Sequence, residues 1–166
     1  AQVREVSAGS SYTIYRSWFE FDTSGITSNV SDLDFKVYLH SSCRSEDSNA
    51  IFIKSTAADH TSPAVGNFGD VDFSRAYSAA ATVVADDCGD YFEFVGNGFG
   101  KCDAKNLDAF KVAIVQHTYD YLDAEPSDTD SHYIYFYNTG YTGTSRDPKI
   151  EVTTGGDDDG CISWNP

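Results

Sequence analysis

The chain has 166 residues and a mass of 18.2 kDa, which suits one domain with a single core. Its 26 acidic and 11 basic side chains give a formal net charge of -15, and this sign disfavours nucleic acid and anionic membrane surfaces as partners. No apolar run approaches the roughly 20 residues of a membrane span, so we expect no membrane insertion.

Apolar and polar residues alternate along several short segments, as in half-buried strands. The clearest segment is 32–40, where one face carries Leu33, Phe35, Val37 and Leu39. Similar strands are predicted over 17–22, 110–114, 133–137 and 150–152, and weaker ones over 51–54, 71–73, 82–85 and 91–95. Clusters of Gly, Asp, Ser and Asn separate them, as in sandwiches and barrels. The Ala-rich segment 75–84 is predicted as the one short helix.

These segments predict an all-β fold, a single antiparallel β-sandwich of jelly-roll type over residues 1–154. Residues 155–166 form a separate tail, in which the acidic run 157–159 precedes Ile162 and Trp164. We interpret the tail either as a solvated segment or as a strand that anchors to a sheet. The chain begins at Ala1 without Met, which indicates either removal of a secretory signal or trimming.

Four cysteines occur, at Cys43, Cys88, Cys102 and Cys161. An even number in an acidic sandwich without CxxC spacing favours two disulfides and an oxidising, extracellular compartment over a zinc site. The sequence leaves three connectivities open. Pairing of Cys88 with Cys102 would close a short loop and leave Cys43 for Cys161.

Two further sites are candidates on composition. Asn29 begins an Asn-Val-Ser glycosylation tripeptide in a polar segment before a strand. Asp86, Asp87 and Asp90 supply hard oxygen donors in a loop and are candidate Ca²⁺ ligands, although the pattern is not an EF-hand. The alternative for these carboxylates is a solvated acidic surface. No other cofactor is expected.

Several aromatic side chains are predicted on outward faces of strands. In the expected register these are Trp18, Tyr38, Tyr133, Tyr135 and Tyr137. Three interpretations remain open: stacking on sugar rings, packing against another subunit, or cover by a loop of the same chain.

Once the strands are placed, three segments resemble the DNRLRE-type β-sandwich family. The segment 16–26, Arg-Ser-Trp-Phe-Glu-Phe-Asp-Thr-Ser-Gly-Ile, is similar to its early signature. The segment 29–38 resembles the strand that follows it. The segments 134–137 and 141–153 resemble the closing hairpin, in which a proline precedes the last core strand. The acidic hexapeptide that names the family is absent. The resemblance implies a jelly-roll sandwich found on extracellular, cell-wall and virion proteins, some of which bind carbohydrate.

One departure from the family concerns the N-terminus. Relatives carry one or two further strands before the signature, whereas only fifteen residues precede Arg16 here. We therefore expect an unpaired sheet edge, which a neighbouring subunit fills by strand addition with its N-terminus or with the segment containing Ile162 and Trp164. Such a contact is heterologous and builds a filament.

No catalytic motif is evident: HxH, HExxH and GxSxG spacings are absent. We predict a non-catalytic, extracellular structural or adhesive subunit that assembles head to tail into a surface fibre or a virion or cell-surface structure. The alternative is a carbohydrate-binding module of a polysaccharide-acting protein.

Overall fold

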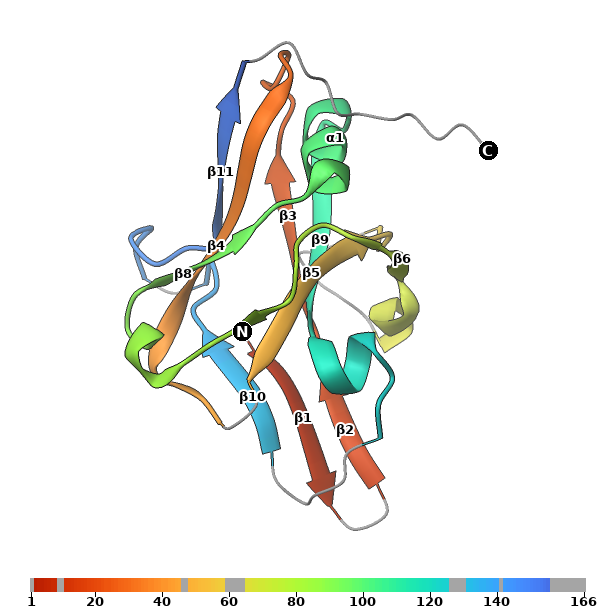
Figure 1. The fold of residues 1–166 in the computed structure, drawn as a ribbon, viewed down its shortest axis with the longest axis vertical. Helices are drawn as coiled ribbons and strands as arrows, with labels where there is room; N and C mark the ends of the chain where they lie inside the picture. Colours follow the sequence, from red (N-terminus) through yellow and green to blue (C-terminus); the bar gives the residue numbers. More distant parts are fainter. Residues whose placement is uncertain are drawn as a thin grey trace.

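The computed structural model describes residues 2–8, 11–45, 48–58, 65–125, 131–140 and 142–155. A six-stranded sheet contains β1 (Gln2–Ala8), β2 (Ser11–Tyr15), β4 (Val30–Arg44), β8 (Tyr91–Val95), β10 (Ser131–Phe136) and β11 (Lys149–Thr154). A five-stranded sheet contains β3 (Ser17–Asp22), β5 (Asn49–Ser55), β6 (Val71–Ala76), β7 (Ala81–Thr82) and β9 (Ala109–Gln116). All named pairings are antiparallel, which confirms the predicted all-β sandwich (Figure 1).

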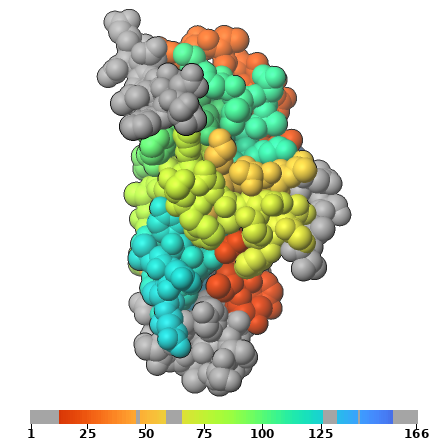
Figure 2. All heavy atoms as spheres, turned by 90° about the vertical axis from the view of Figure 1, so that its right-hand side faces the viewer, coloured from red at the N-terminus to blue at the C-terminus, as the bar shows by residue number. Residues whose placement is uncertain are grey.

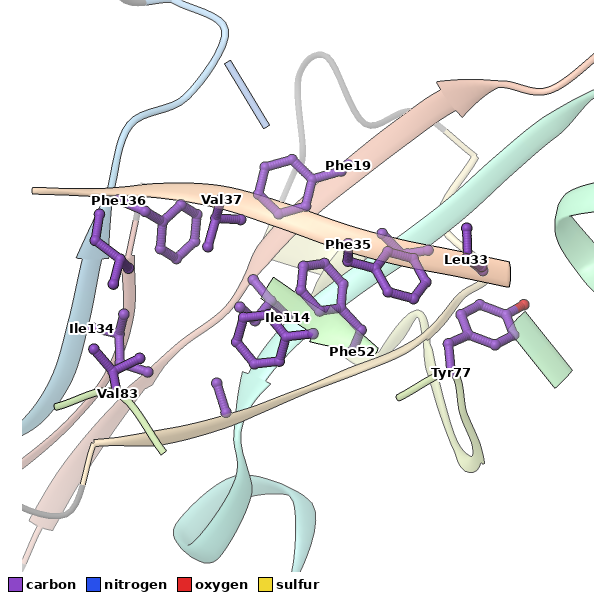
Figure 3. Packing of buried hydrophobic residues seen from close by; sticks show 14 of the residues in the cluster. Phe19, Leu33, Phe35, Val37, Phe52, Tyr77, Val83, Ile114, Ile134 and Phe136 are labelled. Carbon is purple, nitrogen blue, oxygen red and sulfur yellow. The ribbon is translucent and has the colours of Figure 1, made fainter. Parts of the chain in front are cut away.

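Phenylalanines from both sheets meet in the core between them (Figure 3). Phe35 of β4 stacks on Phe52 of β5 with ring centroids 4.6 Å apart, and Phe19 of β3 lies 5.9 Å from Phe136 of β10. The predicted alternation along β4 is confirmed, because its four inward side chains, Leu33, Phe35, Val37 and Leu39, are at most 1% exposed. Burial of these rings supplies the main favourable term for folding.

The five-stranded sheet is apolar on its outer face as well. Ile51, Ile53, Ala113 and Val115 form a second buried cluster there, against which Trp18 packs. Figure 2 looks onto this side, where the segment of β6, in yellow-green, lies beside the segment of η3 (His117–Tyr121), in cyan. The chain therefore covers this face with its own short elements.

The chain passes from one sheet to the other at Arg16, between β2 and β3. Its guanidinium makes two hydrogen bonds to Asp120 in the π-helical turn η3, at 2.8 and 2.6 Å, and lies 3.9 Å above the ring of Phe68. The two charged side chains are only 8% and 3% exposed. This buried ion pair holds the corner against η3, and the sequence did not predict it because the partners lie 104 residues apart.

The helix prediction was wrong in its position. The helix α1 spans Gly98–Asn106, outside the predicted segment, and the Asn97 side chain caps it by accepting the N–H groups of Phe99 and Gly100. The Ala-rich segment 75–84 instead contains the end of β6 and the short strand β7. Within the described ranges, no helix has the length and apolarity needed to cross a membrane.

The N-terminal residues also differ from the expectation. They form two strands, β1 and β2, and β1 pairs with both β10 and β2. β1 is thus paired on both sides, whereas β2, which directly precedes Arg16, pairs with β1 alone among the described strands.

Candidate functional site

β11 pairs with β4 alone and so presents an open edge in the described part of the six-stranded sheet. Two other strands of this sheet also have a single described partner, namely β2 beside β1 and β8 beside β4. β8 and β11 pair with the same residues of β4, 34–36, so they lie on opposite sides of it. The N–H of Leu39 donates to the carbonyl of Asp90 beside β8, whereas the carbonyl of Tyr38 accepts from Tyr137 beside β10. The backbone groups of successive strand residues point to opposite sides, so those of Tyr38 point away from β8. β10, which bonds to Tyr38, therefore lies on the same side of β4 as β11.

β10 and β11 therefore follow each other along one side of β4. β1 pairs with the outer side of β10, and its register begins with Gln2 opposite Tyr135. No described strand occupies the corresponding position beside β11. A strand added beside β11 would therefore lie end to end with β1, in a position that no described strand fills.

The ladder shows which backbone groups face this position. The carbonyl of Leu33 accepts a hydrogen bond from the residue after β8, so odd-numbered residues of β4 bond toward β8 and even-numbered ones toward β11. The partners of those even-numbered residues are Lys149 and Glu151. The N–H and C=O groups of Ile150 and Val152 consequently point to the open edge. Their side chains pack against the core but are only partly buried.

Charged side chains form a ladder across the outer face at this edge. The Lys36 ammonium lies 2.7 Å from a carboxylate oxygen of Glu151 and 3.0 Å from one of Glu93, and Lys149 lies 2.8 Å from Glu151. Hydrogen bonds from Lys149 and then Lys36 lower the pKa of Glu151 to about 2. Hydrogen bonds to Glu151 and Glu93 raise the pKa of Lys36. Because these groups are exposed, the ladder fixes register more than it adds stability.

The predicted outward tyrosines do lie outside the core, but the chain covers several of them. The Arg146 guanidinium lies over the rings of Tyr38 and Tyr137, at 5.2 and 4.9 Å. The hydroxyl of Tyr38 donates to the Gly89 carbonyl, and that of Tyr91 donates to Asp147 at 3.0 Å. These contacts hold two loops to the sheet, which favours the interpretation of cover by the same chain.

Tyr133 and Tyr135 form a separate pair on the same outer face. Their rings stack with centroids 4.5 Å apart and 24° between planes, and both side chains are half-buried. Trp18, in contrast, packs against the cluster on the outer face of the five-stranded sheet, where its indole Nε1 has no hydrogen-bond partner among the residues that the structure describes. The structure therefore separates the predicted aromatic set into three places. Ile162 and Trp164 lie outside the described residues.

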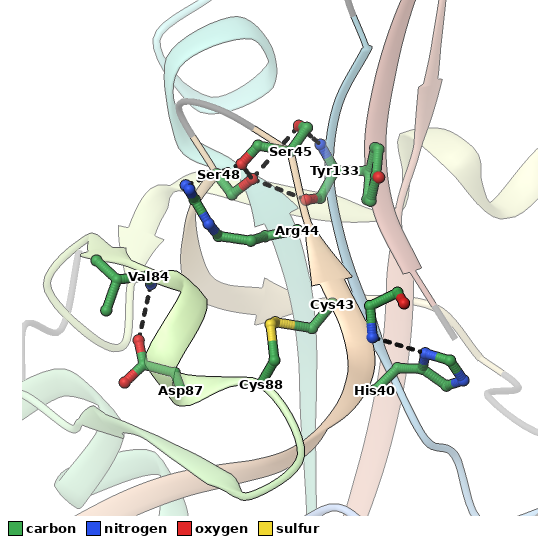
Figure 4. Close-up of a disulfide and its surroundings, with 10 residues drawn as sticks. His40, Cys43, Arg44, Ser45, Ser48, Val84, Asp87, Cys88 and Tyr133 are labelled. Carbon is green, nitrogen blue, oxygen red and sulfur yellow. Dashed lines mark hydrogen bonds between the residues drawn. A yellow bond between two sulfur atoms is a disulfide. The ribbon is translucent and has the colours of Figure 1, made fainter.

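The disulfide pairing in the structure differs from the pairing considered above. Cys43 of β4 is bonded to Cys88, after the turn η2 (Ala85–Asp87), with a Cα–Cα distance of 5.4 Å (Figure 4). The Cys88–Cys102 and Cys43–Cys161 pairs are thus wrong, because β4 and β8 bring Cys43 and Cys88 together although 45 residues separate them. Cys102, on α1, is disulfide-bonded too, and Cys161 lies outside the described residues.

The predicted calcium ligands make local contacts. The carboxylate of Asp87 accepts the N–H of Val84 at 2.8 Å, and that of Asp90 accepts the N–H of Tyr91 at 2.7 Å; Asp86 is exposed. In the ranges that the structure covers, no three His, Cys, Asp or Glu side chains are grouped to hold a metal ion. The calcium site stays a prediction.

Asn29, the candidate glycosylation site, lies just before β4 and is half-buried. Its side-chain oxygen accepts a hydrogen bond from Lys105 of α1, and its carbonyl accepts the N–H of Gly155 at 2.9 Å. A glycan there would stand beside the end of β11, and its presence remains a prediction.

Comparison with known proteins adds no family. No family model matches the chain, and no curated protein matches it. The resemblance to DNRLRE-type domains is therefore still a prediction.

Proposed function

We propose that the chain is a non-catalytic structural or adhesive subunit of an extracellular assembly, in which each copy accepts a strand from a neighbour at the open edge of β11. The observation that carries this proposal is the one-sided pairing of β11, with Ile150 and Val152 half-exposed at the border of the core. A strand added there would bond to the outward backbone groups of Ile150 and Val152, which pair with no described strand, and would cover these side chains.

The edges at β6 and β8 are less suited to this role, and β2 is a further edge with β1 as its one described partner. β6 carries a register shift against β5, and the N–H of Ser74 is already bonded to the Asp72 side chain. The residue after β8, Gly96, is bridged to Ser78. Pro148 directly precedes β11, which fits an edge strand, since proline occurs at the first residues and edges of strands. The Cys43–Cys88 disulfide is compatible with an extracellular location.

A matched pair of variants tests the acceptor edge. Val152→Pro removes one N–H at the open edge and leaves the pairing with β4 intact, whereas Val152→Thr keeps the N–H with a similar loss of apolar surface. We expect concentration-dependent linear assemblies in negative-stain images and light scattering for the wild type and for Val152→Thr, but monomers for Val152→Pro. Ile150→Pro should act alike, and circular dichroism checks that each variant is folded. Assembly of folded proline variants, or a wild type that stays monomeric at high concentration, refutes the proposal.

A second function, carbohydrate binding, is favoured by the stacked pair Tyr133 and Tyr135. Half-exposed rings of this kind stack on the apolar faces of sugars. Affinity electrophoresis in polysaccharide gels tests it: Tyr135→Ala should abolish retardation, and Tyr135→Phe should preserve it because the ring remains. Equal mobility of wild type and Tyr135→Ala in all polysaccharides counts against this function.

A further inference from the structure

We infer that the strand added to β11 is β2 of a second copy of this chain, so that the six-stranded sheets of successive copies join edge to edge. This inference rests on the proposed strand addition at β11 and names its partner. It starts from the other end of the same sheet, where β2 has β1 as its one described partner.

The hydrogen-bond pattern shows which backbone groups of β2 point outward. Tyr137, just after β10, donates its N–H to a carbonyl of β4, so odd-numbered residues of β10 bond toward β4 and even-numbered ones toward β1. The register continues this alternation, so odd-numbered residues of β1 bond to β10 and even-numbered ones to β2. Their partners in β2 include Thr13 and Tyr15. The N–H and C=O groups of Tyr12 and Ile14 consequently point away from β1.

β2 lacks the features that protect most edge strands from other chains. Its sequence, Ser-Tyr-Thr-Ile-Tyr, contains neither charge nor proline, and its register with β1 is unbroken. Among the strands of five or more residues that have one described partner, β2 alone has no charged side chain. Because each copy has a formal net charge of -15, an uncharged strand meets less repulsion when it approaches a neighbour. β2 is therefore the edge best suited to contact a second copy.

The side chains of β2 also suit the position beside β11. Tyr15 and Tyr133 lie opposite the same residue of β1, so Tyr15 shares the outer face of the sheet with Tyr133. Alternation along the strand then places the half-buried Ile14 on the core side. In the joined sheet Ile14 would lie in the same layer as Ile150 and Val152, whose side chains are only partly buried. The contact would thus bury apolar side chains of both copies on one face.

The two edges lie at opposite ends of the molecule. In Figure 1, β11 is at the upper left with β4 on its right, whereas β2 is at the lower right with β1 on its left. The twist of the sheet thus turns the open sides of β11 and β2 away from each other. One copy therefore cannot pair its own β2 with its own β11, and the contact with the next copy is heterologous, head to tail. Such a contact leaves one edge of each kind at the two ends, so it repeats into the linear assemblies proposed above.

A matched pair of variants of β2 tests this partner. Ile14→Pro removes an outward N–H and leaves the bonds to β1 intact, whereas Ile14→Thr keeps the N–H with a similar loss of apolar surface. We expect Ile14→Thr to assemble like the wild type and Ile14→Pro to be monomeric in light scattering, with circular dichroism as the check of folding. Ile14→Pro keeps the edge of β11 and Val152→Pro keeps the edge of β2. An equimolar mixture of these two variants should therefore give particles of twice the 18.2 kDa of the chain and nothing larger.

The outcomes separate the partner strand from the proposed function. Assembly of folded Ile14→Pro, with monomers for Val152→Pro, overturns β2 as the partner and leaves the acceptor edge standing. Assembly of Val152→Pro overturns both. A mixture that stays monomeric at a concentration at which the wild type assembles overturns the pairing of β2 with β11.

Hydrogen exchange on the wild type tests the same contact without any variant. Above the concentration of assembly, exchange followed by mass spectrometry should slow in both 11–15 and 149–154, because the outward N–H groups of both strands become hydrogen-bonded. Slower exchange in 149–154 without a change in 11–15 overturns β2 as the partner. Unchanged exchange in both segments overturns the partner and the acceptor edge together.

Discussion

The ion pair between Arg16 and Asp120 provides the sharpest test of how the two sheets are joined. Both side chains are nearly inaccessible, at 8% and 3% exposure, and the carboxylate accepts two hydrogen bonds from the guanidinium. Asp120→Asn leaves the buried guanidinium without its counter-charge. Removal of one partner of a buried pair costs about 3–5 kcal/mol. For a domain of 166 residues this corresponds to a fall in Tm of roughly 6–20 °C.

The effect should be specific to the pair. Urea unfolding of Arg16→Met, Asp120→Asn and the double variant forms a double-mutant cycle, and an unchanged m-value shows that the denatured state is not altered. We expect the double variant to lose clearly less stability than the sum of the single variants, because removal of both charges leaves no unpaired one. Single-variant losses below about 1 kcal/mol, or strict additivity in the cycle, would refute the reasoning.

Three further predictions concern stability and titration. Replacement of both Cys43 and Cys88 by Ala should lower the free energy of unfolding by about 4 kcal/mol in denaturant titrations, because the bridge closes a loop with a sequence separation of 45; an unchanged midpoint would contradict this. Gly96→Ala should destabilise by about 1–3 kcal/mol, since its Cβ would stand 2.6 Å from a backbone oxygen of β4, whereas Gly98→Ala, with open space around it, should be tolerated in thermal melts. The carboxylate of Glu151 should titrate near pH 2 in NMR spectra; its lowered pKa stabilises the fold above about pH 4.5, and this contribution is lost as the pH falls through about 2. A titration midpoint of Glu151 above pH 4 would show that its contacts with Lys149 and Lys36 do not persist in solution.

Much of the fold follows from local pattern. The alternation in 32–40 correctly assigned the inward face of β4, and Ile134 and Phe136 were correctly separated from the tyrosines between them. Such assignments succeed because the side-chain period of a strand is a property of neighbouring residues. The helix prediction failed because it also used only neighbouring residues. The alanine content of 75–84 favoured a helix, but β6 and β7 in this segment pair with β5.

The candidate site needed information that local pattern does not carry. The proline before β11 was visible, but the side on which β11 has no described partner strand depends on where β4 places β8 and β10. Likewise, the alternation of apolar and polar residues predicted that Tyr38 lies outside the core. The contact of its ring with Arg146, more than 100 residues away, depends on the fold.

The sequence by itself thus determined that the chain forms an acidic sandwich with an aromatic core, because alternation, turn residues and charge act over a few neighbouring positions. Tertiary structure alone decided that Cys43 meets Cys88, that Arg16 meets Asp120 and that β11 has a described partner strand on one side only. Each of these depends on contacts between segments tens of residues apart, and many pairings of the same strands would satisfy the same alternation.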